Sequence, residues 1–279
     1  MDWLNHWNCA LEYLERHLDG EIDPGELGRL AGCSAYHFQR MFSYLAGVPL
    51  GEYIRRRRMT RAAADLQSGE KVLDVALRYG YESPTSFNRA FQSVHGIPPS
   101  QAKQAGVTLK AYPRIHFKFV LKGAEEMEYQ IVKRESFRIV GFRTLLPTEV
   151  EESFQTVPQF WMEIGPRQTE LFPLMNGEPA GMLGVSTCGE EENYYYIAVA
   201  SNSPVPEGMH EWMVPAATWA VFTGTGRLPD TIQELQRRIV SEYLPGSGYE
   251  WAKAPDIEVY LNRPGAESRF QVWLPVTKR

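Results

Sequence analysis

The chain has 279 residues, of which 43% are hydrophobic and 23% are charged. This composition is that of a globular protein with apolar cores, and the length suits two domains. No apolar run approaches the roughly 20 residues of a membrane-spanning helix, which argues against a membrane protein. The N-terminal segment lacks the pattern of a signal peptide, and the three cysteines lack metal-ligand spacing. We therefore expect a cytoplasmic protein with reduced thiols, no metal and no cofactor.

The net charge of −5 hides an uneven distribution along the chain. Residues 1–26 carry a net charge of −6, residues 27–106 one of +6, and residues 107–279 one of −5. A basic block between two acidic ones is typical of a segment that binds a polyanion. We therefore expect double-stranded DNA to bind within the basic block.

Apolar residues recur at helical spacing as far as Gln104, with glycines at the breaks. Ser34 and Ser83 stand where a hydroxyl would cap the next helix, and Pro84 suits a first helical turn. The pattern predicts helices at residues 2–18, 24–30, 35–45, 49–67, 71–78, 84–94 and 99–104.

Part of this helical half occurs twice. Residues 32–49 read GCSAYHFQRMFSYLAGVP, and residues 81–98 read YESPTSFNRAFQSVHGIP. In both copies a short helix and a tight turn precede the repeated helix, which is the helix-turn-helix pattern. Two such helices about one DNA turn apart, roughly 34 Å, would read successive major-groove segments. One chain then carries both reading helices, so a monomer suffices.

Each repeated helix carries polar residues on the face opposite its pair of phenylalanines. Arginine and glutamine side chains form bidentate hydrogen bonds with guanine and adenine edges in the major groove. We therefore expect base contacts from the first copy through Tyr36, Gln39 and Arg40, and from the second through Thr85, Ser86 and Arg89.

The predicted helix between the copies contains the run YIRRRRMTRAAADL. Five arginines occur without an acid between Tyr53 and Ala64, which favours contacts with DNA phosphates over a merely solvated face. At least one of them is expected to pair internally with Glu52 or Asp65. The expected phosphate contacts are Ser34, Arg55, Arg56, Arg57, Arg58 and Arg61.

These motifs resemble the AraC/XylS family of bacterial transcription regulators. The resemblance covers about 100 residues, and the run from Val75 to Pro98 is its most specific part. It implies two helix-turn-helix units joined by a long helix, with the base-reading positions given above and Pro84 added to those of the second unit. Relatives often carry a polar residue at that proline. The resemblance also implies an activator that engages RNA polymerase.

The second half of the sequence changes to short alternating or apolar runs, which are typical of strands. Helices are predicted only at residues 149–164 and 229–243. The order strand, helix, strand, strand occurs over residues 127–200 and again over 209–276, which indicates an internal duplication. Two such units would place both helices on one face of a joined antiparallel sheet, and would leave the other face and the seam free to form a groove for a small molecule.

The sequence thus predicts two domains. Residues 1–106 are an all-α tandem helix-turn-helix domain that binds DNA, and residues 107–126 are a linker and leading strand. Residues 127–279 are an α+β domain of duplicated β-α-β-β units that binds a small-molecule effector.

The segment PDIEVYL suggests what that effector is. Alternation along a strand separates Ile257 and Val259 from Glu258. We expect the apolar residues beneath the helices and Glu258 in the groove, with aromatic walls formed by Trp161, Tyr196, Trp219 and Tyr260. A carboxylate among aromatic rings suits a lipophilic cation, because each ring face adds roughly 0.5–2 kcal/mol. A solvated strand glutamate among core aromatics is the alternative.

The segments EMEYQIVKRESFRIVGFRT, PQFWMEIG and PDIEVYL also resemble the GyrI-like effector-binding domain. This resemblance implies a pocket acid at Glu258 and a pocket role for Trp161. Some GyrI-like domains are similar to hydrolases of reactive lipophilic compounds, so Glu258 as a general base is one alternative function. A groove that binds a partner protein is another. The histidines are scattered and no nucleophile–histidine pairing is recognisable, so we expect a protein that is not an enzyme.

Overall fold

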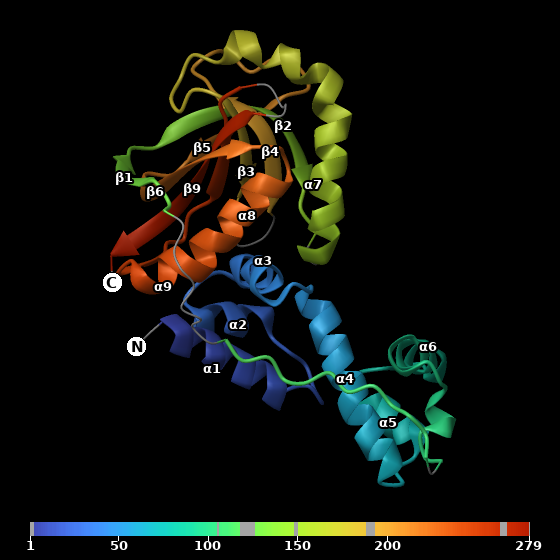
Figure 1. Cartoon of the computed structure of the whole chain (residues 1–279). Helices are drawn as coiled ribbons and strands as arrows, with labels where there is room; N and C mark the ends of the chain where they lie inside the picture. Colours follow the sequence, from blue (N-terminus) through green and yellow to red (C-terminus); the bar gives the residue numbers. More distant parts are fainter. Residues whose placement is uncertain are drawn as a thin grey trace.

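The computed structural model describes residues 3–104, 106–117, 126–147, 150–187, 193–262 and 267–278. A helical N-terminal half lies below a C-terminal half built on one antiparallel sheet (Figure 1). No helix among these residues is both long and apolar enough to span a bilayer. The N-terminal helices are α1 Trp3–Arg16, α2 Pro24–Ala31, α3 Ala35–Ala46, α4 Leu50–Gln67, α5 Val72–Arg78, α6 Pro84–His95 and the 3-10 turn η1 Pro99–Gln101. The predicted helices are confirmed, except that the last is only this short turn.

The two copies of the repeat begin and end in the same way. Ser34 Oγ accepts a hydrogen bond from the His37 amide, and Ser83 Oγ accepts one from the Thr85 amide, each at 3.2 Å. Each repeated helix stops at a glycine in the left-handed region, where other residues are strained. The predicted caps are therefore confirmed, and α3 and α6 have equal lengths and equivalent positions.

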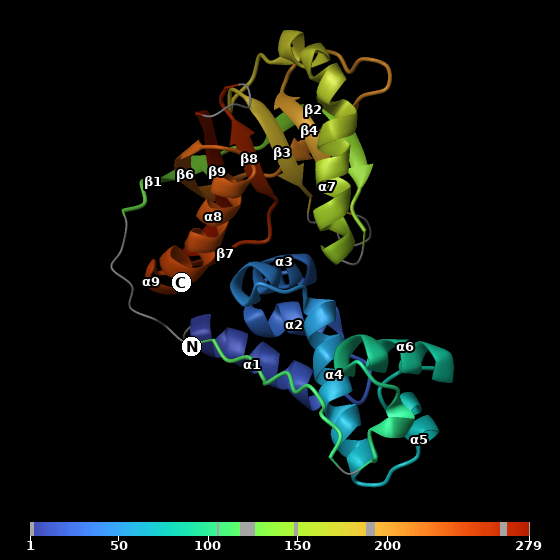
Figure 2. The ribbon, with the colours of Figure 1, turned by 45° about the vertical axis from the view of Figure 1, so that its right-hand side comes forward.

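The two helical units have different surroundings. The second unit, α5 and α6 with the C-terminal part of α4, has a core of its own around Phe87 and Phe91. The core of the first unit, around Trp7 and Phe38, is continuous with that of the C-terminal half through Val240 and its neighbours. Figure 2 shows α5 and α6 standing away from the sheet, whereas α3 lies directly below it. The first unit and the C-terminal half thus pack together.

A buried ion pair joins α1 to α4. Arg57 donates hydrogen bonds to both carboxylate oxygens of Glu15 at 2.8 Å, and the Tyr53 hydroxyl donates to the same carboxylate at 2.7 Å. The side chains of Arg57 and Glu15 are only 13% and 4% exposed. The expectation that Arg57 contacts a phosphate is therefore wrong for this arrangement. Arg58 is also held in the fold, because it donates to the carbonyl groups of Leu18 and Gly20.

The C-terminal sheet has the strand order β1-β6-β9-β8-β3-β4-β2-β5, and β7 pairs with β9 outside this path. Its strands are β1 Tyr129–Arg134, β2 Phe137–Leu145, β3 Met182–Ser186, β4 Tyr194–Ala200, β5 His210–Val214, β6 Ala217–Gly226, β7 Tyr249–Trp251, β8 Asp256–Tyr260 and β9 Ser268–Lys278. The helical segments are α7 Val150–Ile164, the 3-10 turns η2 Gly165–Glu170 and η3 Phe172–Leu174, α8 Asp230–Arg238, the π-helical segment η4 Ile239–Tyr243 and α9 Leu244–Gly246.

The strand order confirms the duplication. It reads the same from both ends when β1 is exchanged for β5, β6 for β2, β9 for β4 and β8 for β3. Each half of the duplicated sheet has one more leading strand than predicted. That strand pairs with the other half of the sheet, β1 with β6 and β5 with β2. The leading strand predicted within residues 107–126 is absent from 107–117, and its remainder, 118–125, lies outside the described residues. The seam between the units is the β3–β8 pair.

The helices cover the face of the sheet that carries Glu258. Phe160 and Ile164 of α7 pack with Tyr195, which lies on that face. Ile257 and Val259 point to the other face, where aromatic side chains of the same sheet bury them. The expectation that these two residues lie under the helices is therefore wrong. Both faces of the sheet are buried, so the polarity of alternate residues does not reveal which face the helices cover.

We predict that Glu15→Gln lowers the free energy of unfolding of the helical half by about 3 kcal/mol, because it leaves the buried Arg57 without a counter-charge. Glu12→Gln is the matched control, since it breaks only the exposed pair with Arg16 and is expected to change stability by less than about 0.5 kcal/mol. Urea unfolding followed by far-ultraviolet circular dichroism measures both variants. Equal losses would contradict a structural role for the buried pair.

Candidate functional site

A cavity of about 800 Å³ lies over the β3–β8 seam, between α7 and α8. The strands form its floor, and the facing sides of the two helices form its walls. Trp161 and Met162 come from α7, Ile232 and Gln236 from α8, and Glu258 from β8. The duplication thus builds the cavity, because it brings one helix of each unit to either side of the seam.

Neutral donors hold the carboxylate of Glu258. Its Oε2 accepts hydrogen bonds from the hydroxyl groups of Tyr260 at 2.8 Å and Tyr195 at 3.2 Å. Its Oε1 accepts one from the Gln236 amide at 2.7 Å, and the Trp161 indole N–H donates to the Tyr195 hydroxyl at 2.9 Å. Burial, and then the Glu258 charge, raise the pKa of both tyrosines well above the usual range, so both remain donors. These hydrogen bonds compensate the desolvation of the carboxylate without neutralising its charge.

Gly184 makes room for this network. It lies opposite Glu258 on β3, and a Cβ atom there would lie 2.3 Å from the Tyr195 hydroxyl and 3.0 Å from Glu258 Oε2. Any larger residue would therefore push the tyrosine away from the carboxylate. Nothing in the run MLGVS indicates this role, because the clash depends on a strand that pairs with it from elsewhere in the chain.

Three of the five residues predicted for the effector pocket lie together. Glu258, Trp161 and Tyr260 line the cavity, and the rings of the two aromatic residues meet edge to face at 5.1 Å. Tyr196 and Trp219 are instead buried on the opposite face of the sheet, so their prediction as pocket walls is wrong. In the run YYYIAVAS the register of β4 turns Tyr195 toward Glu258, and Tyr196 away from it. The sequence does not give that register.

Helix α3 of the first helix-turn-helix unit closes one end of the cavity. Tyr36, Arg40 and Tyr44, which are spaced four apart on one face of α3, all line it. The Tyr44 hydroxyl donates to the Gln236 side chain at 2.8 Å, and Gln236 in turn donates to Glu258. Sequence reasoning did not foresee any of these three as pocket residues, because the contact joins segments about 200 residues apart.

Arg40 is the charged centre of this contact. Its guanidinium forms an ion pair with Asp256, and its Nη2 lies 3.6 Å from Glu258 Oε1. The side chains of Arg40, Asp256 and Glu258 are 11%, 7% and 15% exposed. His37, one turn before Arg40, lies with Nε2 3.3 Å from Asp256 and stacks on Trp251. The carboxylates of Asp256 and Glu258 therefore share one positive charge, that of the Arg40 guanidinium on α3.

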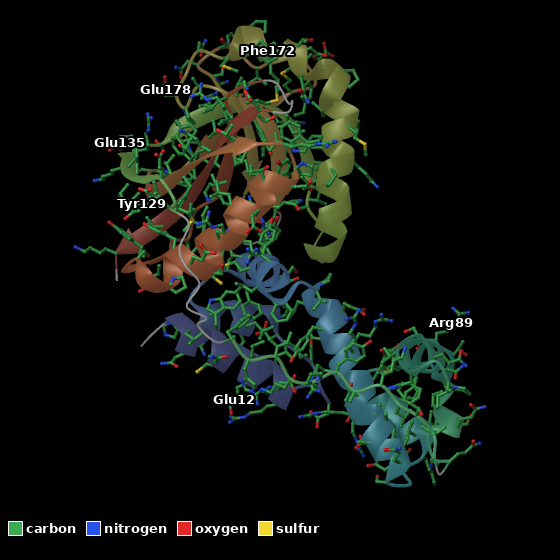
Figure 3. All side chains as sticks on the ribbon, in the orientation of Figure 1. Glu12, Arg89, Tyr129, Glu135, Phe172 and Glu178 are labelled. Carbon is green, nitrogen blue, oxygen red and sulfur yellow. The ribbon has the colours of Figure 1, made fainter. Side chains whose placement is uncertain are left out.

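The equivalent surface of α6 is open. Pro84, Thr85, Ser86 and Arg89 are all exposed, and Arg89 has no hydrogen-bond or ion-pair partner among the described residues. Figure 3 shows Arg89 at the upper edge of α6, well separated from the sheet. Tyr36 and Gln39 of α3 are half-buried by comparison. The repeat thus presents one free copy and one copy that is attached to the C-terminal half.

The C-terminal half also covers part of the groove between the two helix-turn-helix units. A second cavity, of about 1220 Å³, lies there and is lined by Gln39, Arg55 and Arg58, together with residues 145–147 from the end of β2. On α4, Arg55 and Arg56 both pair with Glu52, as expected for internal pairing. The C-terminal half therefore overlies part of the surface between the two repeated helices.

Comparison with known proteins accounts for both halves. Residues 27–105 match the family model of a helix-turn-helix domain, and residues 130–276 match that of the integron-associated effector binding protein. The multiple antibiotic resistance protein MarA of Escherichia coli (strain K12) is 35% identical over 101 residues, which cover 36% of this chain and 80% of MarA. The chain belongs to the AraC family.

Two further relatives extend the match. The transcriptional activator AarP of Providencia stuartii is 40% identical over 91 residues, 32% of this chain and 67% of AarP. The right origin-binding protein of Escherichia coli (strain K12) is 26% identical over 268 residues, which cover 92% of this chain and 91% of that protein. This AraC-family regulator therefore joins a tandem helix-turn-helix region to a GyrI-like effector-binding domain. In it, α3 and α6 are the second helices of the two helix-turn-helix units, and of these two helices only α6 is clear of the C-terminal half.

The acidity of Asp256 provides a test of the contact with α3. Burial alone would raise the pKa of Asp256, but the Arg40 charge and the His37 hydrogen bond outweigh it and lower the pKa from 3.8 to about 2. The resulting stabilisation is complete above about pH 4 and is lost as the pH falls through about 2, a contribution of about 2 kcal/mol.

We therefore predict that the stability difference between the wild type and Asp256→Asn shrinks by about 2 kcal/mol between pH 5 and pH 2. The variant lacks the group that titrates, so only the wild type loses this contribution. Urea unfolding followed by tryptophan fluorescence at both pH values gives the difference. A difference that stays constant would show that Asp256 is not held by Arg40 in solution.

Proposed function

We propose that this chain is a DNA-binding transcription activator that binds a lipophilic cation in its C-terminal domain. Helices α3 and α6 read two successive major-groove segments, with base contacts from Tyr36, Gln39 and Arg40 and from Pro84, Thr85, Ser86 and Arg89. The relatives support activation, since AarP is a transcriptional activator. An activator of this kind engages RNA polymerase, and one chain with two reading helices acts as a monomer.

The phosphate contacts in this proposal come from α4 and from the start of α3. Arg55, Arg56 and Arg61 remain candidates, because the side chains of Arg55 and Arg56 are 40% and 33% exposed and Arg61 is half-buried. Ser34 stands at the N-terminus of α3, where backbone amide groups also favour a phosphate. Arg57 and Arg58 are left out of the proposal because the fold already uses them.

The buried carboxylate of Glu258 carries the proposal for the cation. It lies in a cavity whose lining includes the rings of Trp161 and Tyr260. A lipophilic cation satisfies both features, because it pairs with the carboxylate while its apolar groups fill the cavity. A cation adds a second counter-charge to this carboxylate beside Arg40, whereas a neutral ligand adds none and an anion would be repelled.

The hydrolase alternative has less support from this geometry. A general base needs a carboxylate oxygen that can accept a proton from water. Both oxygens of Glu258 already accept hydrogen bonds, Oε1 from Gln236 and Oε2 from Tyr195 and Tyr260. This arrangement holds the carboxylate for pairing with a charge.

The DNA part of the proposal predicts different effects for two arginines. Arg89→Ala should weaken binding to a site selected from random duplexes by about 1–3 kcal/mol, because one bidentate base contact is lost, while binding to unrelated DNA stays the same. Arg61→Ala should weaken both kinds of binding alike and lower the salt slope by about one. Fluorescence anisotropy at several salt concentrations measures these effects. An equal loss on all sequences for Arg89→Ala would assign it to a phosphate.

The cation part predicts that Glu258→Gln lowers the affinity for tetraphenylphosphonium by about 10-fold or more, because the carboxylate charge is lost from a desolvated site. Binding of the neutral triphenylphosphine oxide should change little. Isothermal titration calorimetry with both compounds checks this, and Glu211→Gln, at an exposed pair with Arg138, is the control. Equal affinity of the wild type and Glu258→Gln for the cation would remove Glu258 from the site.

A further inference from the structure

The proposed contact of Arg40 with DNA is incompatible with its position in the structure. In the proposed DNA complex its side chain lies in the major groove with those of Tyr36 and Gln39. In the structure the same side chain is 11% exposed and paired with Asp256 and Glu258. A base edge cannot reach a guanidinium that lies between the C-terminal domain and α3. The first recognition helix can therefore read DNA only after it leaves the effector site.

We propose that the lipophilic cation and Arg40 compete for this site, so that the cation releases α3 for DNA binding. Without the cation, Arg40 acts as an internal counter-ion and keeps the first unit attached to the C-terminal domain. With the cation bound beside Glu258, α3 detaches and the regulator reads both half-sites. This inference rests on the proposed function, because it requires both DNA and a cation as ligands.

Electrostatics sets the direction of the coupling. A cation that pairs with Glu258 comes close to the Arg40 guanidinium, whose Nη2 is 3.6 Å from Oε1 of the same carboxylate. Two positive charges at such distances repel each other strongly in a desolvated site. The cation therefore binds better when α3 is detached. By thermodynamic linkage, the cation must then favour the detached state by the same factor.

A hydrogen-bond chain connects the cavity to α3. Tyr44 donates to Gln236, and Gln236 donates to the oxygen of Glu258 that faces Arg40. A ligand that draws the carboxylate toward itself weakens this chain at its second bond. The cavity and α3 thus share both a charge pair and a hydrogen-bond network.

The open second unit completes the mechanism. Because α6 is free while α3 is attached, the cation-free protein still holds DNA through one reading helix. It is expected to protect one half-site, and the cation-bound protein two. The cation would then lengthen the footprint as well as raise the affinity.

The test measures DNA affinity by anisotropy on a selected site, with and without saturating tetraphenylphosphonium. We expect the cation to raise the affinity about 10-fold, within the usual range of coupling between sites, and the footprint to extend from one half-site to two. Asp256→Asn removes the partner of Arg40 and leaves Glu258 in place. It should bind DNA about 10-fold more tightly without the cation and respond to the cation by less than about 2-fold.

Two further variants complete the design. Tyr44→Phe breaks only the hydrogen bond to Gln236, so it tests the attachment by a milder change and should raise cation-free DNA affinity in the same direction. Glu211→Gln alters an exposed pair of the same domain and should behave as the wild type.

The outcomes separate the two proposals. If DNA and tetraphenylphosphonium both bind but the cation leaves DNA affinity unchanged or lowers it, competition with Arg40 is refuted while the proposed function stands. Cation-free DNA affinities of Asp256→Asn and Tyr44→Phe equal to that of the wild type would refute it as well. If either ligand fails to bind the wild type, the proposed function itself is wrong.

Discussion

The arrangement of this regulator depends on how one buried arginine is neutralised. Arg40 of α3 finds its counter-charges on β8, where Asp256 and Glu258 lie two residues apart on the same face of the strand. An arginine buried without such partners would destabilise the protein by several kcal/mol. The ion pair therefore fixes where the first unit sits against the C-terminal domain. It also explains why the two copies of one repeat differ so much in exposure.

The duplicated sheet provides both the carboxylates that pair with Arg40 and the cavity beside them. Because the two units meet at the β3–β8 seam, their helices stand on either side of it and leave a cavity between them. Glu258 in this cavity accepts hydrogen bonds from neutral donors, the hydroxyl groups of Tyr195 and Tyr260 and the amide of Gln236. One carboxylate is then available to two cations, the guanidinium of α3 and a ligand in the cavity. A shared counter-ion of this kind couples two binding events without a long-range pathway.

Local patterns predicted most of the fold. The repeat, its serine caps and the arrangement of helices followed from spacing, and the order of strands and helices revealed the duplication. Three of the five predicted pocket residues lie in the cavity. Tyr196 and Trp219 do not, because strand register and the burial of both sheet faces are tertiary properties. The contact between Arg40 and Asp256 joins residues 216 positions apart, and no local pattern encodes such a pairing.

The distance between the first unit and the C-terminal domain tests this account most directly. Spin labels at the exposed positions Arg16 on α1 and Glu163 on α7, with the native cysteines replaced by serine, report it by pulsed electron resonance. In the free protein we expect a single narrow distribution that matches the structure. Saturating duplex with tetraphenylphosphonium should shift it to longer distances. An unchanged distribution with both ligands bound would show that α3 stays on the effector domain, and would contradict the account.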